Sequence, residues 1–386
     1  MQKKFTTTLI CFVLFFSACH TDKKPDPDKY TLQATETLLS FPLDEETKIY
    51  IFHLHAYTDP NGEEYLVFQN RNDPQLLFYN MQTQQLHKKI TCDRQGPDAV
   101  RRFSGFSIKD MNEIYLVHYH MDGMSVIDGE GKPLHVYENK TKEGVTVKID
   151  GGSTSVPLNV INNKLYIPLS LNREYGEEVK FQKSNLCATF DLATQQLKLL
   201  PLTHLAISER EGEDLIVLYY SRCTDGKQFV YSFQDAEDLY VTDLEHTTLK
   251  KIKAKSKYLS TLKFKPQEVT MVGPTNCIRV ETPHYGAIFH DPYRKVYYWI
   301  AYPKAKIEKG INCLELSIFG GKNFSIIILN EDLEIIGETL MPDYTYNPEL
   351  CFVRKDGFYI SESHVLNPNF DENKLCFRKL ELVKKK

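Results

Sequence analysis

The chain has 386 residues, of which 42% are hydrophobic and 12% are aromatic, and its 47 Lys and Arg against 51 Asp and Glu give a formal net charge of −4. A protein that binds nucleic acid needs a basic stripe to neutralise phosphates, and a protein that docks on anionic lipid needs a polybasic face. The mildly acidic balance argues against both classes, and we expect no nucleic-acid partner.

The first nineteen residues have the layout of an export signal. Two lysines near the start precede an apolar run, residues 9–16, that is too short to span a bilayer. The small residues before Cys19 resemble the cleavage site of bacterial lipoproteins, although Phe16 stands where such signals usually carry Leu. This resemblance implies that residues 1–18 are a signal peptide and that Cys19 carries acyl chains, which together anchor a protein stably. The alternative is an ordinary secretory signal that is cut at a neighbouring position.

Residues 19–30 are polar and contain two prolines, a composition typical of a spacer, so we expect them to tether the body to the membrane. Residues 31–386 have the pattern of β-strands: the chain contains 23 Tyr and 22 Phe, and its short alternating runs are broken by Asn, Asp, Gly and Pro. No further apolar run reaches the roughly 20 residues of a transmembrane helix. The sequence predicts a signal peptide, a tether and a single all-β domain.

A hairpin pattern recurs along this domain. A leading strand is followed by two alternating runs joined by a short polar turn, as in residues 65–68, 76–80 and 86–90. Six such units at irregular intervals of roughly 50–65 residues predict a β-propeller with six blades of four antiparallel strands each. A seven-bladed propeller is the alternative, because residues 42–64 have room for another partial sheet.

The two ends of the domain are expected to close the ring. Propellers avoid exposed strand edges, which would pair with other chains. We therefore expect residues 31–41 to complete the last sheet, in the same blade as residues 357–360 and 375–383.

Nine cysteines are present, of which Cys11 belongs to the leader and Cys19 to the lipid anchor. The remaining seven are an odd number, so at least one stays free or pairs outside the chain. Their surroundings are strand-like and apolar and show no zinc-binding spacing. We expect most of them to be buried and unpaired, as in a compartment that does not force disulfides.

Several motifs of the body resemble those of a known family. They are Gln95-Gly96-Pro97, Asp291-Pro-Tyr-Arg-Lys-Val-Tyr-Tyr298 and Asp356-Gly-Phe-Tyr-Ile-Ser361. Together with the lipoprotein signal, they are similar to a family of bacterial envelope lipoproteins whose members are known only as six-bladed β-propellers of unknown function. The resemblance implies this fold and a location in the bacterial cell envelope, where we expect the outer membrane and leave its face open. It implies no catalytic residues.

Two His-x-His pairs are candidate metal ligands: His53 with His55, and His118 with His120. Residues i and i+2 of a strand point to the same face, so each pair presents two imidazoles together. If both pairs line one end of the channel, four neutral imidazoles can hold zinc or another borderline metal. The simpler interpretation is that they are polar strand histidines without a cofactor, because no further ligand stands at a diagnostic spacing.

His364 follows the leading strand of the last unit, and such strand ends reach the mouth of a propeller. With His118 and His120, it is our candidate for ligand binding, or for acid–base chemistry if a carboxylate converges on the same substrate atom. A structural polar loop is the alternative.

The chain contains no Gly-x-Ser-x-Gly and no His-Glu-x-x-His motif. This absence favours a lipid-anchored binding or scaffold protein whose partner is another envelope protein or a glycan. Two alternatives remain. One is an envelope enzyme, such as a glycan-directed hydrolase or lyase with its site at the channel mouth, and the other is a protein that captures a glycan or small ligand without catalysis.

Overall fold

The computed structural model describes residues 25–70, 74–120, 122–150, 152–170, 173–174, 180–181, 184–204, 219–260, 262, 275 and 277–386. The predicted signal peptide, Cys19 and the first part of the tether lie outside these residues.

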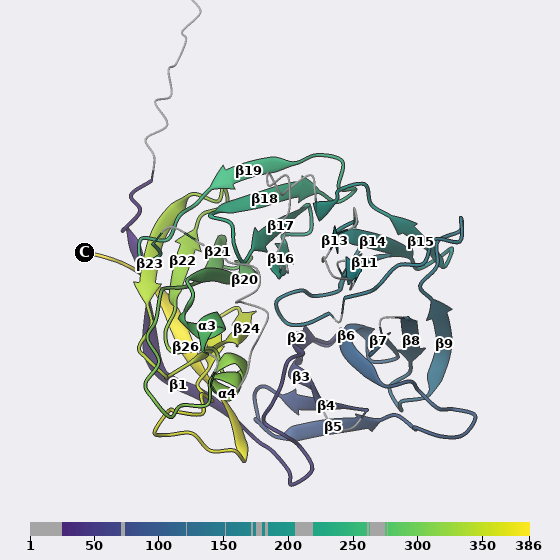
Figure 1. The fold of residues 1–386 in the computed structure, drawn as a ribbon. Helices are drawn as coiled ribbons and strands as arrows, with labels where there is room; N and C mark the ends of the chain where they lie inside the picture. Colours follow the sequence, from purple (N-terminus) through teal and green to yellow (C-terminus); the bar gives the residue numbers. More distant parts are fainter. Residues whose placement is uncertain are drawn as a thin grey trace, which may run out of the picture.

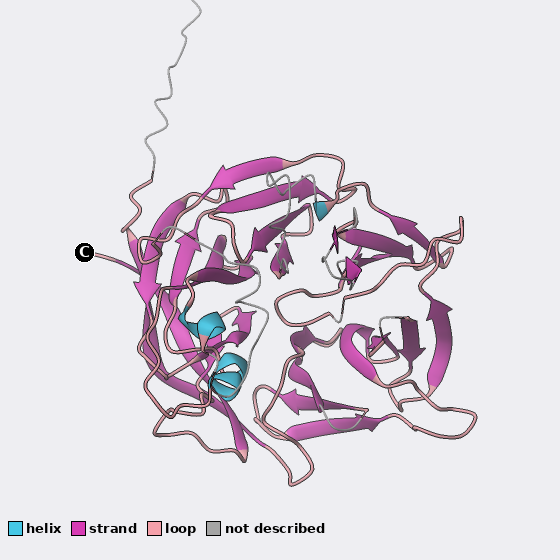
Figure 2. Ribbon diagram, in the orientation of Figure 1, coloured by secondary structure: helices cyan, strands magenta, loops and turns pink. Residues whose placement is uncertain are grey.

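Strands dominate the described chain, and the helices are short (Figure 2). The strands are β1 (Tyr30–Pro42), β2 (Leu54–Thr58), β3 (Glu64–Asn70), β4 (Gln75–Asn80), β5 (Leu86–Thr91), β6 (Phe103–Asp110), β7 (Glu113–His118), β8 (Gly123–Ile127), β9 (Pro133–Glu138), β10 (Asn159–Ile161), β11 (Lys164–Pro168), β12 (Arg173–Glu174), β13 (Lys180–Phe181), β14 (Cys187–Asp191), β15 (Gln196–Leu199), β16 (Tyr220–Thr224), β17 (Gln228–Phe233), β18 (Asp238–Asp243), β19 (Lys250–Lys253), β20 (His284–Asp291), β21 (Val296–Tyr302), β22 (Ser325–Leu329), β23 (Ile335–Leu340), β24 (Asn347–Arg354), β25 (Gly357–Ser361) and β26 (Lys374–Lys384). Helix α3 spans Ile278–Glu281 and helix α4 spans Cys313–Ile318.

The strands form mostly antiparallel sheets that are arranged around a ring (Figure 1). Four sheets have four strands each, in the orders β2-β3-β4-β5, β6-β7-β8-β9, β10-β11-β14-β15 and β16-β17-β18-β19. A further sheet has eight strands in the order β20-β21-β22-β23-β1-β26-β25-β24, and β12 pairs only with β13. Neighbouring sheets share apolar cores, so their faces are buried against one another. The fold is all-β and propeller-like, as the sequence predicts.

The strands that we expected to lead each unit are the second strands of their sheets. They correspond to β3, β7, β11, β17, β21 and β25. The strands before them lie nearer the centre of the ring, as Figure 1 shows for β2, β6, β16, β20 and β24. Some of these inner strands bury few side chains, such as β10, whose residues are all partly exposed. Alternation of apolar residues therefore does not mark them in the sequence.

The first and last strands of the described chain lie side by side (Figure 1). β1 pairs with β26 in antiparallel register from Tyr30 opposite Lys384 to Pro42 opposite Lys374, with an irregularity between Ala34 and Leu38. This is the pairing that we expected of the two chain ends. A single parallel pair, Tyr30 with Gly337, joins β1 to β23 and so connects the two halves of the eight-stranded sheet.

Acidic and amide side chains shape the hairpin turns. At the end of a strand, one side-chain oxygen accepts hydrogen bonds from backbone N–H groups two residues and three or four residues later, which closes an Asx turn. Lys295 follows one of these turns with a φ of 56°, in the left-handed region that completes the reversal. The residues that accept these bonds are Asn80, Asp128, Asp191, Asp291 and Asn330.

The cysteines divide into one pair and five free side chains among the described residues. Cys277 and Cys313 form a disulfide that the sequence did not predict. Cys376 is partly exposed, and the other four free cysteines are buried, as expected of most of the seven: Cys92, Cys187, Cys223 and Cys351.

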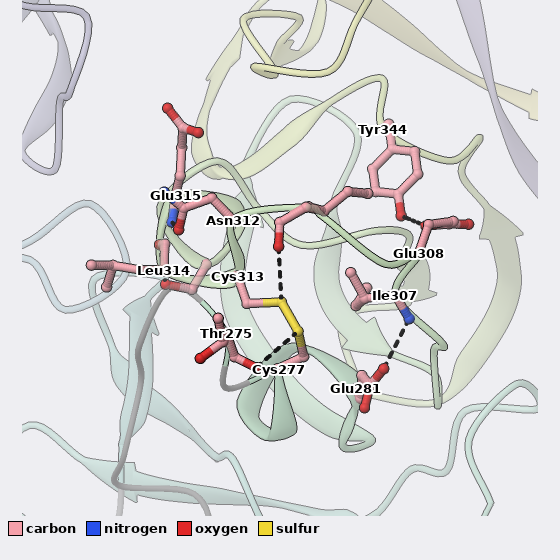
Figure 3. Close-up of a disulfide and its surroundings, with 12 residues drawn as sticks. Thr275, Cys277, Glu281, Ile307, Glu308, Asn312, Cys313, Leu314, Glu315 and Tyr344 are labelled. Carbon is pink, nitrogen blue, oxygen red and sulfur yellow. Dashed lines mark hydrogen bonds between the residues drawn. A yellow bond between two sulfur atoms is a disulfide. The ribbon is translucent and has the colours of Figure 1, made fainter.

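The disulfide joins α3 to α4, which lie together near β24, inside the arc of the eight-stranded sheet (Figures 1 and 3). Ile307, Cys313 and Leu316 form a small core of their own beneath it. Asn312 caps α4 by accepting a hydrogen bond from the backbone N–H of Glu315. Neither helix, nor any other helix of the described residues, is long and apolar enough to cross a membrane.

Candidate functional site

A cavity of about 580 Å³ opens where the innermost strands begin. It lies beside the starts of β16, β20 and β24, the loop before β2, and the two helices. Its volume lies within the range of small-molecule sites, roughly 300–1,000 Å³. The lining residues are Ile51, Phe52, Asp150, Ser153, Ser155, Val156, Ser170, Tyr219, Tyr220, Ser221, Ser232, Gln234, Arg279, His284, Tyr285, Gly286, Ala287, Tyr302, Leu314, Ser317, Ile318 and Glu349.

Most hydroxyl groups of the lining already bond within the protein. Ser221 donates to the carbonyl of Ser155 at 2.7 Å and accepts from the backbone N–H of Ile288. Ser232 accepts from the indole N–H of Trp299 at 2.6 Å. Tyr220 donates to the carbonyl of Leu169, and Ser317 donates to the carbonyl of Leu314. These side chains hold the walls of the cavity together.

Three polar side chains of the lining keep unused hydrogen-bonding capacity. Within the described residues, the guanidinium of Arg279 has no acceptor and no ion pair, and its recorded contact is the ring of Tyr219, 4.9 Å from the guanidinium carbon to the ring centre. The side chains of Gln234 and Ser170 likewise have no protein partner in the described part of the chain. Gln234 lies beside Tyr219, because its backbone N–H donates to the Tyr219 carbonyl. Polar groups that line a cavity with free donors and acceptors are able to bond to whatever the cavity holds.

Two carboxylates and one imidazole also belong to the lining: Asp150, Glu349 and His284. Glu349 accepts a hydrogen bond from the hydroxyl of Tyr302 at 2.9 Å. Burial lowers the pKa of His284 to about 4, so its imidazole is neutral at pH 7. The His284 ring stacks on Tyr302 with 4.4 Å between ring centres, and its Nδ1 donates to the carbonyl of Thr282. His284 therefore serves as a packed, neutral part of the wall.

Apolar side chains are exposed at the cavity. Phe52 is 39% exposed, Tyr219 is 50% exposed and Leu314 is 41% exposed, although all three line the cavity. They come from the loop before β2, the start of β16 and helix α4. The cavity thus combines apolar surfaces open to solvent with polar groups on its wall.

The predicted ligand residue His364 is buried away from this cavity. Its Nε2 donates to the carbonyl of Gly321 at 2.8 Å, and its Nδ1 accepts from the backbone N–H of Leu366. Both ring nitrogens are therefore occupied, and His364 is not among the lining residues. The alternative interpretation, a structural polar loop, describes its contacts.

The second predicted pair is also outside the cavity. His118 is buried, donates from Nδ1 to Asp122 at 3.1 Å and accepts at Nε2 from Ser125. His120 is exposed, and its ring packs against that of Tyr119. Neither histidine lines the cavity, so the structure does not bring His118, His120 and His364 together around one ligand.

The four imidazoles predicted to bind a metal do not form a common site. Across the part of the chain that the structure describes, no group of three or more His, Cys, Asp or Glu is placed to hold a metal ion. His55 instead packs on the ring of Phe106, 4.7 Å between ring centres. Burial lowers the pKa values of His53 and His55 to about 4, and the Nδ1 of the first and the Nε2 of the second have no hydrogen-bond partner.

Arg279, Gln234 and Tyr219 were not among the residues predicted from the sequence. These residues come from separate segments that the fold brings together, and none of them stands in a recognisable motif. The position of Arg279 two residues after Cys277 is the one available signal, because a disulfide there fixes the helix that carries it.

Comparison with known proteins identifies the family. The chain is 28% identical to a member of the DUF4221 family from Bacteroides vulgatus ATCC 8482, whose crystal structure superposes with a TM-score of 0.81 over 93% of this chain and 100% of that chain. A protein of Bacteroides fragilis NCTC 9343 that is named as exported shares the fold with a TM-score of 0.53 at 9% identity, over 95% of this chain and 98% of that chain. No curated protein sequence matches the chain. Residues 29–340 match the DUF4221 family, a domain of unknown function, and the chain belongs to that family.

Proposed function

We propose that this protein is a lipid-anchored binding protein of the bacterial envelope that captures a small polar ligand in its central cavity. The observation that carries the proposal is that Arg279, Gln234 and Ser170, whose side chains have no hydrogen-bond partner among the described residues, line one cavity of about 580 Å³. A wall held by internal hydrogen bonds is largely preformed, which reduces the entropy lost on binding.

The proposal includes a propeller of six blades. The eight-stranded sheet divides naturally at the single pair Tyr30 with Gly337, into β20–β23 and the set β24, β25, β26 and β1. With the four separate sheets, this division makes six blades of four strands. Residues 42–64, which left room for a seventh, contribute β2 and the start of β3 to an existing sheet.

The envelope location rests on the leader sequence and on the disulfide. Disulfides persist in oxidising compartments outside the cytoplasm, so the pair Cys277–Cys313 supports export. Acyl chains on Cys19 then provide the membrane contact, and we expect the outer membrane, with either face open.

Trp299, the single tryptophan of the chain, offers a direct test. It is buried, its indole N–H donates to Ser232, and its ring stacks on Tyr285 at 4.1 Å; both of these residues line the cavity. We would titrate the full chain in detergent with a panel of monosaccharides, sugar acids, amino acids and nucleosides while recording Trp299 emission. We expect Trp299 emission to change in a saturable way with at least one compound.

A blocked cavity provides the control. Ser170→Phe should fill part of the cavity and weaken binding at least tenfold, whereas Ser260→Phe, at an exposed serine outside the lining, should leave binding unchanged. If no compound binds by fluorescence or calorimetry and crosslinking in the native envelope captures a stoichiometric protein partner, the protein is a scaffold. Turnover of a glycan that the Ser170→Phe variant abolishes would instead make it an enzyme.

A further inference from the structure

We infer that the ligand of the central cavity is an acidic sugar, a hydroxyl-bearing ring with one carboxylate that Arg279 binds. This inference rests on the proposed function and names the class of molecule that the same site takes.

Arg279 provides the argument for a carboxylate. A guanidinium has five N–H donors in a planar fork that matches the two oxygens of a carboxylate. The contact of Arg279 with the ring of Tyr219 is not a hydrogen bond, and no described residue accepts from the guanidinium donors. By contrast, the carboxylate of Glu349, on the same lining, already accepts from Tyr302. Among the described residues, no carboxylate forms an ion pair with the Arg279 guanidinium, so this cation is available to an anionic group of a ligand.

The other charges of the lining limit the ligand to a single acid group. Asp150 and Glu349 both line the cavity, and a ligand with several negative charges would be repelled by them. Burial keeps His284 neutral at pH 7, so it adds no second cation. One carboxylate next to Arg279, with the rest of the molecule uncharged, fits this distribution.

The neutral groups provide the argument for a sugar. The amide of Gln234 both donates and accepts, and so does the hydroxyl of Ser170, which matches the hydroxyl groups of a sugar. Phe52 and Leu314 offer exposed apolar surfaces against which the C–H face of a sugar ring packs. A simple aliphatic acid uses Arg279 but leaves these other groups unpaired.

The two helices hold Arg279 in place before the ligand arrives. Cys277 lies two residues before Arg279, and its disulfide to Cys313 fixes α3 against α4, which carries Leu314 (Figure 3). At the end of α3, the side chain of Glu281 accepts a hydrogen bond from the backbone N–H of Ile307, in the segment before α4. Because the backbone that carries Arg279 is fixed in this way, only the side chain itself loses freedom when it binds an anion.

The test compares acid and neutral forms of the same sugar. We would measure binding of D-glucuronate, D-galacturonate, D-glucose, D-galactose and acetate to the full chain, by Trp299 emission and by calorimetry. We expect at least one sugar acid to bind tenfold or more tightly than its neutral counterpart and than acetate. Arg279→Met should remove this advantage, and Arg279→Lys should restore part of it.

A matched control separates the local charge from the overall charge. Arg101→Met removes an exposed arginine that pairs with Asp122 outside the cavity, and it should leave binding unchanged. If the protein binds acid and neutral sugars equally well, or if the Arg279→Met variant still prefers the acid, the inference that Arg279 binds a carboxylate of the ligand is wrong. If acetate binds as tightly as the sugar acids, the inference that the ligand is a sugar is wrong. Binding of only other compounds from the wider panel overturns this inference but not the proposed function, whereas binding of no compound at all overturns both.

Discussion

Two arginines of this protein lie at the same distance from an aromatic ring but differ in burial and in hydrogen-bond partners. Arg222 on β16 lies 4.9 Å over the ring of Phe229, and Arg279 on α3 lies 4.9 Å over the ring of Tyr219. Arg222 is fully buried between two sheets and has a partner for each of its nitrogen atoms, whereas Arg279 is partly exposed in the cavity wall without an acceptor among the described residues. Stacking on an aromatic ring therefore does not reveal the role of an arginine; the atoms that accept from it do.

The partners of Arg222 are backbone and neutral side-chain atoms. Its Nε and one terminal nitrogen donate to the carbonyl of Pro157, and that nitrogen also donates to the carbonyl of Tyr166 at 2.8 Å. The other terminal nitrogen contacts the sulfur of Cys187 at 3.1 Å and the hydroxyl of Tyr231 at 3.5 Å. One side chain thus ties the β10–β15 sheet to the β16–β19 sheet.

The largest effect should come from Arg222→Met. The substitution removes both Arg222 donors from the Pro157 carbonyl and one donor from the Tyr166 carbonyl in a buried interface, and leaving a buried acceptor without its donor costs roughly 1–3 kcal/mol. We expect the free energy of unfolding of the full chain to fall by about 4 kcal/mol in all. Urea unfolding followed by Trp299 emission measures it. Arg222→Lys should recover only part of the lost stability, because an ammonium group lacks the planar set of donors of a guanidinium. An unchanged or higher stability of the Met variant would show that burying the charge costs more free energy than its hydrogen bonds contribute.

The disulfide should give the next largest effect, and it tests what holds the second arginine. The pair Cys277–Cys313 spans a sequence separation of 36, and cross-links of this size stabilise by roughly 2–4 kcal/mol through the unfolded state. We expect Cys277→Ser with Cys313→Ser to cost about 3 kcal/mol in local stability of the two helices, measured by hydrogen exchange of α3 and α4. Cys376→Ser is the control, since that cysteine is free and partly exposed. Unchanged exchange of both helices would show that the small core around Ile307 and Leu316 suffices without the disulfide.

The contrast between the two arginines also shows what sequence can predict. Alternating apolar residues and polar turns depend on neighbours in the chain, so the hairpins of the sheets could be predicted. The pairing of the two chain ends could be predicted for another reason, because a closed ring leaves no strand edge exposed. The inner strands could not be placed first in their sheets, because strands such as β10 are short and weakly patterned. The cavity depends on which distant segments meet: Phe52, Gln234 and Arg279 share no local pattern. The hypothesis for the His-x-His pairs assumed that both residues of a pair lie on one strand, whereas His53 precedes β2 and His120 follows the end of β7.

A smaller effect on the free energy of unfolding should come from His204, and it should depend on pH. His204 packs against Tyr220 and Phe233 in the region of Arg222, and neither of its nitrogens has a hydrogen-bond partner. Burial lowers its pKa from 6.5 to about 3. Between these values the unfolded chain takes up a proton that the folded chain refuses, so stability falls as the pH falls from 6.5 towards 3.

His204→Phe should remove this contribution. The loss of stability between pH 7 and pH 5 should shrink by about 2 kcal/mol, since one proton changes the free energy of unfolding by about 1.4 kcal/mol per pH unit. Urea unfolding at the two pH values measures the difference, with the exposed His120→Phe as the comparison. An unchanged pH dependence would mean that His204 takes up its proton at a similar pH in the folded and the unfolded chain, so that burial does not lower its pKa.

The smallest effect on stability should come from Arg279→Met, and this result decides whether the comparison holds. The guanidinium loses only its contact with Tyr219, worth about 0.5–1 kcal/mol at an exposed site, and the methionine sulfur keeps a favourable contact with the same ring. We therefore expect the free energy of unfolding to change by less than about 0.5 kcal/mol, in the same urea assay that reports the Arg222→Met loss. A cost above about 2 kcal/mol, near that of a buried group deprived of its bond, would mean that Arg279 is a structural cation like Arg222. A small cost, together with lost binding of sugar acids, would mean that the protein keeps this charge in its cavity wall for a ligand, because the fold gains almost nothing from it.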